Sequence, residues 1–292
     1  MDLYFEMYSG IAGDMTIAAL LDLGASKDKL IEGINSLGLS GFDLFFDRTK
    51  KNGIDAYNFD VILKGCGHHH DHGHDHDHSH SHDHSHNHED GYGHHHHNHK
   101  DGHDHHHNHS HDNSHDHVHR NLEAIEKIIN STDLNDNIKK NSLGIFDIIG
   151  DSEAKAHGIA KSEVHFHEVG AIDSIIDIVG TCILLDDLGV ENIYFSDLFE
   201  GHGYQMCAHG PMPIPVPAVA NILADSDISL NFIGEEGEHI TPTGAAIVKY
   251  FYKKAPESFK IKKIGLGAGN KDFEKTTNIL RVMEIERDKK KQ

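Results

Sequence analysis

The chain has 292 residues, 32 of them histidine, and a formal net charge of −21 with the histidines neutral. Such an acidic chain repels nucleic-acid phosphates, and its short basic tail (residues 289–291) does not change this, so we expect no nucleic-acid partner. The sequence has no apolar run long enough to cross a bilayer, no signal-peptide pattern at its start and three sparse cysteines, which predicts a cytoplasmic protein without membrane contact.

The first 65 residues predict a strand, two helices and a hairpin. Apolar residues alternate at the start of the chain, Gly24 is suited to end a first helix, and Ser26 is suited to cap a second. An Asn52-Gly53 pair between two alternating segments is typical of a hairpin turn. In chain order these signals predict a strand at 3–7, helices at 15–21 and 27–37, and strands at 42–49 and 57–63.

Helices and strands follow each other again after residue 119. The spacing of Leu, Ile and Phe predicts helices at 120–130, 138–156, 170–188, 217–224 and 243–252, and strands at 193–198, 261–265 and 278–286. Because the rhythm is not strictly strand–helix–strand, we expect an α/β or α+β fold with a mixed sheet and flanking helices. The expected organisation is a core from residues 1–65 and 120–287, a histidine-rich insert at 66–119 and a basic tail at 288–292.

The insert is the strongest compositional signal. Residues 68–119 hold 26 of the 32 histidines, interleaved with Asp, Asn, Ser and Gly, and no apolar periodicity survives there. We therefore expect a disordered segment that binds a borderline divalent metal, and its internal position argues against a purification tag. We favour nickel(II), although imidazole affinity by itself favours copper over nickel and zinc. The candidate ligands are His68, His69, His70, His94, His95, His96, His97, His105, His106 and His107.

A second signal lies at residues 163–180. In an extended segment the imidazoles of His165 and His167 would share one face, and in a helix the carboxylates of Asp173 and Asp177 would lie one turn apart. That helix is otherwise apolar, so the two carboxylates would be partly buried and would need a cation or hydrogen-bond donors. Metal ligation and a capping or hydrogen-bond network explain this pattern equally well.

Three further segments are candidates for the walls of a site. Residues 201–217 form a stiff Gly/Pro-rich segment that carries His202, Cys207 and His209, and we favour a site wall over a rigid connector. Residues 9–14 and 241–244 could each present backbone N–H groups to a phosphate at a helix start, but neither matches a known phosphate-binding motif. His157 and His239 fit structural or surface roles better than ligand roles.

Several blocks of the chain occur together in one family. They are YFEMYSGIAGDM (4–15), VHFHEVGAIDSIID (164–177), GHG (201–203), HGPMPIPVPA (209–218), TPTGAA (241–246) and GLGAG (265–269). The chain resembles the nickel insertion proteins of nickel-pincer cofactor synthesis over nearly its whole length apart from the insert. The resemblance implies a metal-inserting lyase, a nickel chelatase. It would insert nickel(II) into a pyridinium-3,5-bisthiocarboxylic acid mononucleotide, with two Ni–S bonds, one Ni–C bond and loss of the ring C4 proton.

The resemblance also implies cofactors, partners and a division of labour. Full-length members use CTP with a divalent cation and continue with a C-terminal nucleotide-binding domain, so this chain fits the N-terminal half of a split enzyme that needs a separate C-terminal half. We also expect a homo-oligomer. The rival interpretation is a non-catalytic nickel storage protein or metallochaperone.

Residue chemistry suggests three groups of site residues within these blocks. The catalytic candidates are His165, His167, Glu168 and Asp173. The cofactor-binding candidates, suited to a phosphate or a second metal, are Ser9, Gly10, Gly13, Asp14, Thr241, Thr243 and Gly244. The metal-binding candidates outside the histidine tract (residues 68–119) are Asp177, His202 and His209.

Overall fold

The computed structural model describes residues 1–64, 120–166, 171–207 and 209–287, and these belong to one unit. The strands are β1 (Asp2–Glu6), β2 (Phe42–Lys51), β3 (Ile54–Leu63), β4 (Arg120–Asn121), β5 (His165–Phe166), β6 (Asn192–Phe195), β7 (Leu198–His202), β8 (Tyr204–Cys207), β9 (Gly210–Pro213), β10 (Leu230–Glu236), β11 (Phe259–Ala268) and β12 (Ile279–Arg287). The helices are α1 (Gly13–Leu23), α2 (Lys27–Ser36), α3 (Leu122–Asn130), α4 (Asp136–His157), α5 (Ile172–Asp187), α6 (Pro217–Leu223) and α7 (Pro242–Phe251), with a 3-10 turn at Lys161–Glu163. The histidine tract lies outside the described residues, so its disorder and the domain boundaries remain predictions.

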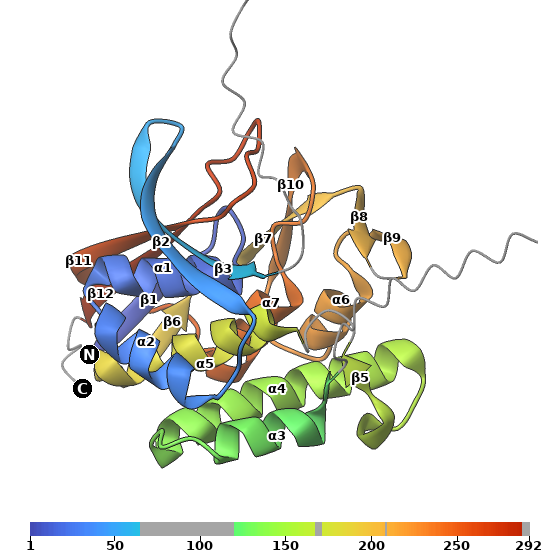
Figure 1. Ribbon diagram of the computed structural model, residues 1–292. Coiled ribbons are helices and arrows are strands. Elements are labelled where there is room, and N and C mark those ends of the chain that lie inside the picture. Colours follow the sequence, from blue (N-terminus) through green and yellow to red (C-terminus); the bar gives the residue numbers. More distant parts are fainter. Residues whose placement is uncertain (65–119, 167–170, 208, 288–292) are drawn as a thin grey trace, which may run out of the picture. The chain divides into compact units, whose positions relative to one another are not determined.

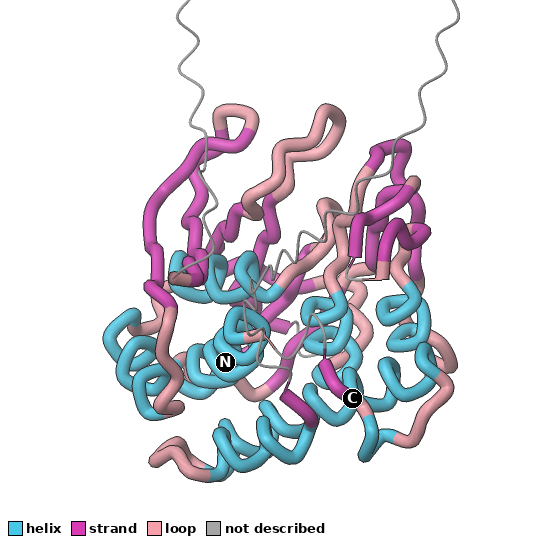
Figure 2. Tube along the Cα trace, turned by 45° about the vertical axis from the view of Figure 1, so that its right-hand side comes forward, coloured by secondary structure: helices cyan, strands magenta, loops and turns pink. Residues whose placement is uncertain are grey.

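The central feature is a mixed sheet with the strand order β2-β3-β11-β12-β1-β6. β1 pairs in parallel with β6 and antiparallel with β12, which confirms the predicted mixed sheet. Helices flank the sheet, with α3 and α4 forming an outer layer beside α5 and α7 (Figure 1). Figure 2 shows the helices on one side of this unit and the tips of the strands projecting on the opposite side. No helix among the described residues is both long and apolar enough to span a membrane.

Local signals in the sequence located most element boundaries. Gly24 adopts the left-handed conformation (φ 112°) at the end of α1, and the Ser26 hydroxyl accepts a hydrogen bond from the Lys29 N–H at 3.3 Å at the start of α2. Asn52 and Gly53, with φ of 50° and 81°, form the turn between β2 and β3. Both φ values are positive, as tight hairpin turns require, so the predicted hairpin is confirmed.

Three segments differ from the predictions. The expected strand at 193–198 is two strands, β6 and β7, because the Ser196 hydroxyl accepts a hydrogen bond from the Met7 N–H and donates one to the Asp197 carbonyl, which turns the chain. The Gly/Pro-rich segment is extended as expected, but it forms the β8–β9 hairpin. β10, which pairs with β7, had no alternating signal because Gly234 and two glutamates interrupt its apolar residues.

Two glycines of β11 bring α1 close to the sheet. A Cβ atom at Gly267 would lie 2.0 Å from the Met15 carbonyl oxygen, and one at Gly265 would lie 2.2 Å from the Ala19 carbonyl oxygen. A larger residue at either position would therefore push α1 away from the strand. This close packing also determines where the first turn of α1, with Asp14, lies relative to β3.

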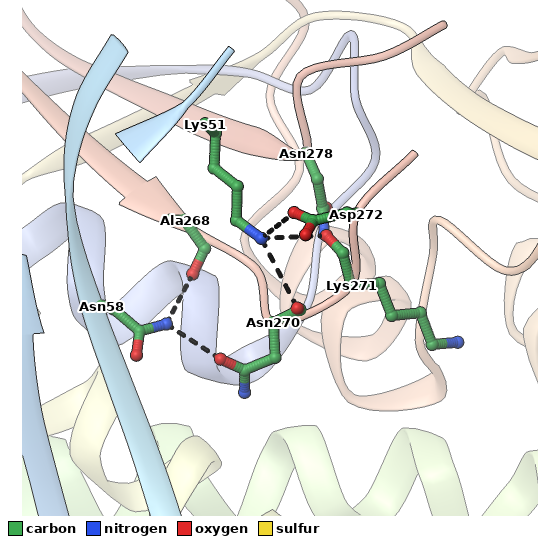
Figure 3. Close-up of polar contacts among 7 residues, drawn as sticks. All are labelled: Lys51, Asn58, Ala268, Asn270, Lys271, Asp272 and Asn278. Atoms are coloured by element: carbon green, nitrogen blue, oxygen red, sulfur yellow. Dashed lines mark hydrogen bonds and ion pairs between the residues drawn. The ribbon is translucent and has the colours of Figure 1, made fainter. Parts of the chain in front are cut away.

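The β2–β3 hairpin is joined to β11 and to the segment that follows it by side chains as well as by backbone pairing. Figure 3 shows the polar contacts among Lys51, Asn58, Ala268, Asn270, Lys271, Asp272 and Asn278. The buried Lys51 ammonium donates to the carbonyl oxygens of Asn270 and Lys271, at 3.4 and 3.2 Å, and pairs with Asp272 at 2.5 Å. The Asn58 amide donates to the Ala268 carbonyl at 3.3 Å and the Asn270 side chain at 2.9 Å. These contacts hold β3, and with it Asp60, against the rest of the sheet.

Candidate functional site

A cavity of about 300 Å³ lies where three helices begin. α1 begins at Gly13, α5 at Ile172 and α7 at Pro242, and residues near all three starts contribute to its wall. The lining residues are Ala12, Gly13, Asp14, Asp60, Val61, Asp173, Ser174, Asp177, Thr241, Pro242 and Thr243. We call this space the carboxylate cavity.

Four aspartates give the cavity its name, and its surroundings resist the ionisation of Asp14, Asp173 and Asp177. Burial raises the pKa of Asp14 to about 6, and the charges of Asp60 and Asp173 add to the rise. Burial, together with the charges of its neighbours, also raises the pKa of Asp177 well above its ordinary value. Asp173 is exposed to solvent at its rim, yet partial burial raises its pKa as well. The cavity therefore favours protons or a cation beside its carboxylates.

The convergence of three helix starts offsets part of this repulsion. The unpaired N–H groups and the macrodipole of a helix place partial positive charge at its first turn. Asp14 and Asp173 lie in the first turns of α1 and α5, where a negative charge is stabilised. The cavity consequently combines fixed positive dipoles with carboxylate oxygens, a combination that suits a hard cation bound together with an anionic group.

One oxygen of Asp177 has no partner within the described part of the chain. Its Oδ1 atom is out of contact with solvent and accepts no hydrogen bond there. Its other oxygen, Oδ2, is covered by the first residue of α1, because a Cβ atom at Gly13 would lie 2.5 Å from it. A buried carboxylate oxygen without a donor is costly, so this atom favours a cation or a proton in the cavity.

The backbone of residues 9–12 is held tightly against residues 239–241. The Ile11 N–H donates to the His239 carbonyl at 2.9 Å, and the Thr241 N–H donates to the Ile11 carbonyl at 3.1 Å. Gly10 has φ +82° and a Cβ there would lie 2.0 Å from the His239 oxygen, while a Cβ at Gly244 would lie 2.3 Å from the Ile11 oxygen. Both glycines thus allow close backbone approach, and the Thr241 hydroxyl caps α7 by accepting from the Gly244 N–H.

Buried contacts of Glu200 and His239 stabilise residues 239–241. Glu200 is completely buried, and its Oε1 accepts hydrogen bonds from the His239 N–H at 2.7 Å and the Gly201 N–H at 2.8 Å. The His239 ring stacks on Phe273 at 3.9 Å and contacts the Thr276 hydroxyl at 3.1 Å. Burial raises the pKa of Glu200 and lowers that of His239. His239 is therefore a buried structural residue. The role of Glu200 was missed, because one acid in an alternating segment carries no signal.

The cavity brings together candidates that are far apart in sequence. Gly13, Asp14, Asp173, Asp177, Thr241 and Thr243 all line it. Ser9 and Gly10 lie in the loop leading to α1, and Gly244 lies in the first turn of α7. Asp60 was not among the candidates. Its alternation with the buried Phe59 in β3 indicated only that the two side chains point to opposite faces.

The histidine candidates are distributed differently. His202 is exposed at the end of β7, and His209 lies at the tip of the β8–β9 hairpin, in another cavity. His165 belongs to β5, where its backbone pairs with Asn121. His167, Glu168 and the ten ligands predicted in the tract lie outside the described residues.

The carboxylates line their cavity without meeting at one point. Within the described ranges, no three side chains of His, Cys, Asp or Glu are grouped closely enough to hold a metal ion unaided. Mg²⁺ and similar hard cations need no such group, since they are bound through one or two carboxylates, several waters and the phosphate of a ligand. The geometry therefore suits a hydrated cation shared with a substrate.

Comparison with known proteins identifies the family. The model of the nickel insertion protein family matches residues 3–292. The chain belongs to this family. The resemblance read from the motifs is therefore confirmed.

The most similar relatives include three proteins named pyridinium-3,5-bisthiocarboxylic acid mononucleotide nickel insertion protein. Those of Alkaliphilus metalliredigens and Clostridium acetobutylicum are each 45% identical, over 97% and 96% of this chain and 60% and 63% of their own lengths. That of Staphylococcus epidermidis is 37% identical over 97% of this chain and 59% of its own length. The chain thus spans about 60% of the length of these relatives. No solved structure matches it.

Proposed function

We propose that this chain inserts nickel(II) into pyridinium-3,5-bisthiocarboxylic acid mononucleotide, forming two Ni–S bonds and one Ni–C bond as the ring loses its C4 proton. The names of its relatives support the substrate and the reaction. The observation that carries the proposal is the convergence of residues 12–14, 173–177 and 241–243 on one cavity lined by carboxylates. A protein that only stored nickel would not need these distant segments together.

In this proposal the carboxylate cavity binds the phosphate end of the mononucleotide through a hard divalent cation. Four aspartates would repel a bare phosphate; Asp14 and Asp177 would hold the cation, which would supply the positive charge that offsets this repulsion. The N-terminal turns of α1 and α7 place the positive ends of their helix dipoles beside the same phosphate. We assign Oδ1 of Asp177, which accepts no hydrogen bond among the described residues, as a protein ligand of this cation.

Asp173 is the described residue best suited to take the C4 proton. It combines solvent exposure, which lets a substrate reach it, with a raised pKa, which makes its carboxylate a stronger base. His165, His167 and Glu168 remain catalytic candidates on sequence grounds. The step balances because the C4 proton passes to the base and Ni²⁺ takes its place on the same carbon.

Several features of the whole enzyme belong to the same proposal. The histidine tract serves as a nickel reservoir, and CTP with a divalent cation is used with the region of the relatives that this chain does not match. A homo-oligomer completes this assembly. Each is a prediction from the family resemblance.

The test is a reconstitution of the reaction. Purified chain is incubated with the mononucleotide and Ni²⁺, with and without CTP and a C-terminal half, and the metallated product is measured by mass spectrometry. We expect product that depends on CTP and on the C-terminal half, and we expect Asp177→Asn to abolish it. Asp43→Asn is the matched control, because Asp43 is an exposed residue of β2 that pairs with Lys64 and does not line the cavity. Full product formation by Asp177→Asn would contradict the proposed role of the cavity.

The alternative function is a non-catalytic nickel store or metallochaperone. The 26 histidines of residues 68–119 favour it, since many equivalent imidazoles buffer a metal without any reaction. In that case nickel binds, no product forms even with the C-terminal half and CTP, and Asp177→Asn leaves nickel binding unchanged.

A further inference from the structure

A second cavity of about 250 Å³ lies between the end of α4 and the tip of the β8–β9 hairpin. Its walls are formed by the last turn of α4, the hairpin and the starts of α6 and α7. The lining residues are Glu153, Ala156, His157, Cys207, His209, Met212, Val216, Pro217, Ala218 and Pro242. We call it the nitrogen–sulfur cavity, because its donors are two imidazoles, a thiol and a thioether.

The donors of this cavity are close to one another. The rings of His157 and His209 have centroids 5.0 Å apart, although the two residues are more than fifty positions apart in the chain. Cys207 and His209 flank the hairpin tip, and Met212 follows in β9. Glu153 lies one turn before His157, with its carboxylate 3.4 Å from His157 Nε2. A carboxylate beside an imidazole is the usual means of orienting a metal-binding histidine.

The position of the cavity also favours a cation. His157 is the last residue of α4, a helix of 22 residues whose C-terminal turn carries partial negative charge. The donors are not yet gathered at one point, but His209 is exposed at a hairpin tip and His157 is one-third exposed. Binding of an ion here therefore requires these side chains to rotate toward one another.

We propose that the nitrogen–sulfur cavity is a binding site for a borderline divalent cation, with His157, Cys207 and His209 as its ligands. Imidazole and thiolate select nickel, copper or zinc over magnesium, so this site and the carboxylate cavity take different metals. The choice of nickel rests on the proposed function. In that function this cavity is where the ion is held beside its substrate. The existence of the site rests on the donors that line this cavity and on the closeness of its two imidazoles.

The two cavities share a wall. Pro242, the first residue of α7, lines both of them. A mononucleotide whose phosphate lies in the carboxylate cavity therefore has a second metal site next to it, on the far side of this proline. Sulfur ligands of the substrate can then replace those of the protein as the ion is transferred, since thiolate and thiocarboxylate are donors of similar softness.

The test uses the full chain with Ni²⁺ and no substrate. Thiolate ligation gives a near-ultraviolet charge-transfer band, which residues 68–119 cannot produce without the neighbouring Cys66 because they contain no cysteine. We expect the band in the unaltered chain, its loss in Cys207→Ser, and its retention in the matched Cys66→Ser. His157→Ala and His209→Ala should each raise the nickel concentration for half of the band by about tenfold or more. Asp177→Asn should leave the band unchanged, which separates this proposal from the proposed function.

A second measurement guards against a variant that fails to fold. In the unaltered chain, Ni²⁺ should slow alkylation of Cys207 by at least about tenfold, followed by peptide mass spectrometry. The proposal is overturned if no band forms, if the band survives Cys207→Ser, if it disappears in Cys66→Ser, or if nickel leaves alkylation of Cys207 unchanged. Product formation that is normal in Cys207→Ser at limiting nickel would likewise exclude a role for this site in transfer.

Discussion

The metal-binding side chains of the carboxylate cavity are four aspartates, whereas the nitrogen–sulfur cavity offers two imidazoles, a thiol and a thioether. They also differ in rigidity. The first is built on the starts of three helices and on backbone contacts that tolerate only glycine at residues 10 and 244. The second is built at a helix end and a hairpin tip, where His157 and His209 are exposed to solvent. The difference suggests that one cavity positions a charged substrate and the other accepts and releases a metal ion.

The largest expected effect is the loss of product in a variant of the carboxylate cavity that leaves the nitrogen–sulfur cavity unaltered. Asp177→Asn should lower product formation roughly 10²–10⁴-fold, because it removes the orphaned oxygen that we assign to the cation. Mn²⁺ bound in the carboxylate cavity, followed by electron paramagnetic resonance, should be lost in parallel. The nickel–thiolate band should not change. If Asp177→Asn also removed the band, the two cavities would not be separate sites.

The next effect tests the rigidity of the carboxylate cavity. Gly10→Ala should lower the free energy of unfolding by about 3–5 kcal/mol, because it combines a positive φ with a Cβ 2.0 Å from the His239 oxygen. Gly38→Ala is the matched control, since Gly38 also has a positive φ but nothing within 4 Å. It should lose only about 1–2 kcal/mol. Urea unfolding measures both, and equal losses would mean that the loop yields to the added methyl group.

A smaller effect is the dependence of stability on pH without divalent cations. The pKa of Asp14 in the folded protein, about 6, lies above its ordinary value of 3.8. Between these values the folded state binds more protons than the unfolded state, so stability from this group is present at about pH 4 and is lost as pH rises through about 6. The loss should be on the order of 1–2 kcal/mol, allowing for partial exposure of the carboxyl.

Thermal unfolding with a chelator at several pH values measures this slope. Asp14→Asn should flatten it, and Mg²⁺ at about a hundred times its dissociation constant should stabilise the unaltered chain by about 2.7 kcal/mol at neutral pH. A slope that is the same in Asp14→Asn would assign the pH dependence to other groups.

The smallest expected effect on the fold comes from the histidine tract. Replacing residues 67–119 by a short Gly/Ser linker should remove most bound nickel, because 26 histidines are deleted. The thermal midpoint and the reaction at saturating nickel should stay within error of the unaltered chain. The replacement ends before Arg120, because Arg120 pairs with Phe166 in the β4–β5 ladder. Loss of the thermal transition would show that the tract is part of the core.

The sequence by itself determined features that depend on short-range chemistry. The cap at Gly24, the Ser26 hydroxyl, the Asn52-Gly53 turn and the Asp173–Asp177 spacing each involve residues within a few positions of one another. The motif blocks likewise identified the family. Such signals survive in any context because the interacting groups are tethered by the chain itself.

Tertiary structure alone decided which of these residues meet. Asp60 joins Asp14 and Asp177 because β3 is held at β11, and His157 meets His209 because a hairpin folds back over the end of α4. Glu200 in β7 accepts a hydrogen bond from His239, 39 residues further along the chain. Contacts between such distant residues arise from the packing of a whole core, in which glycines at positions 13, 265 and 267 set how closely elements approach. No local pattern encodes that distance.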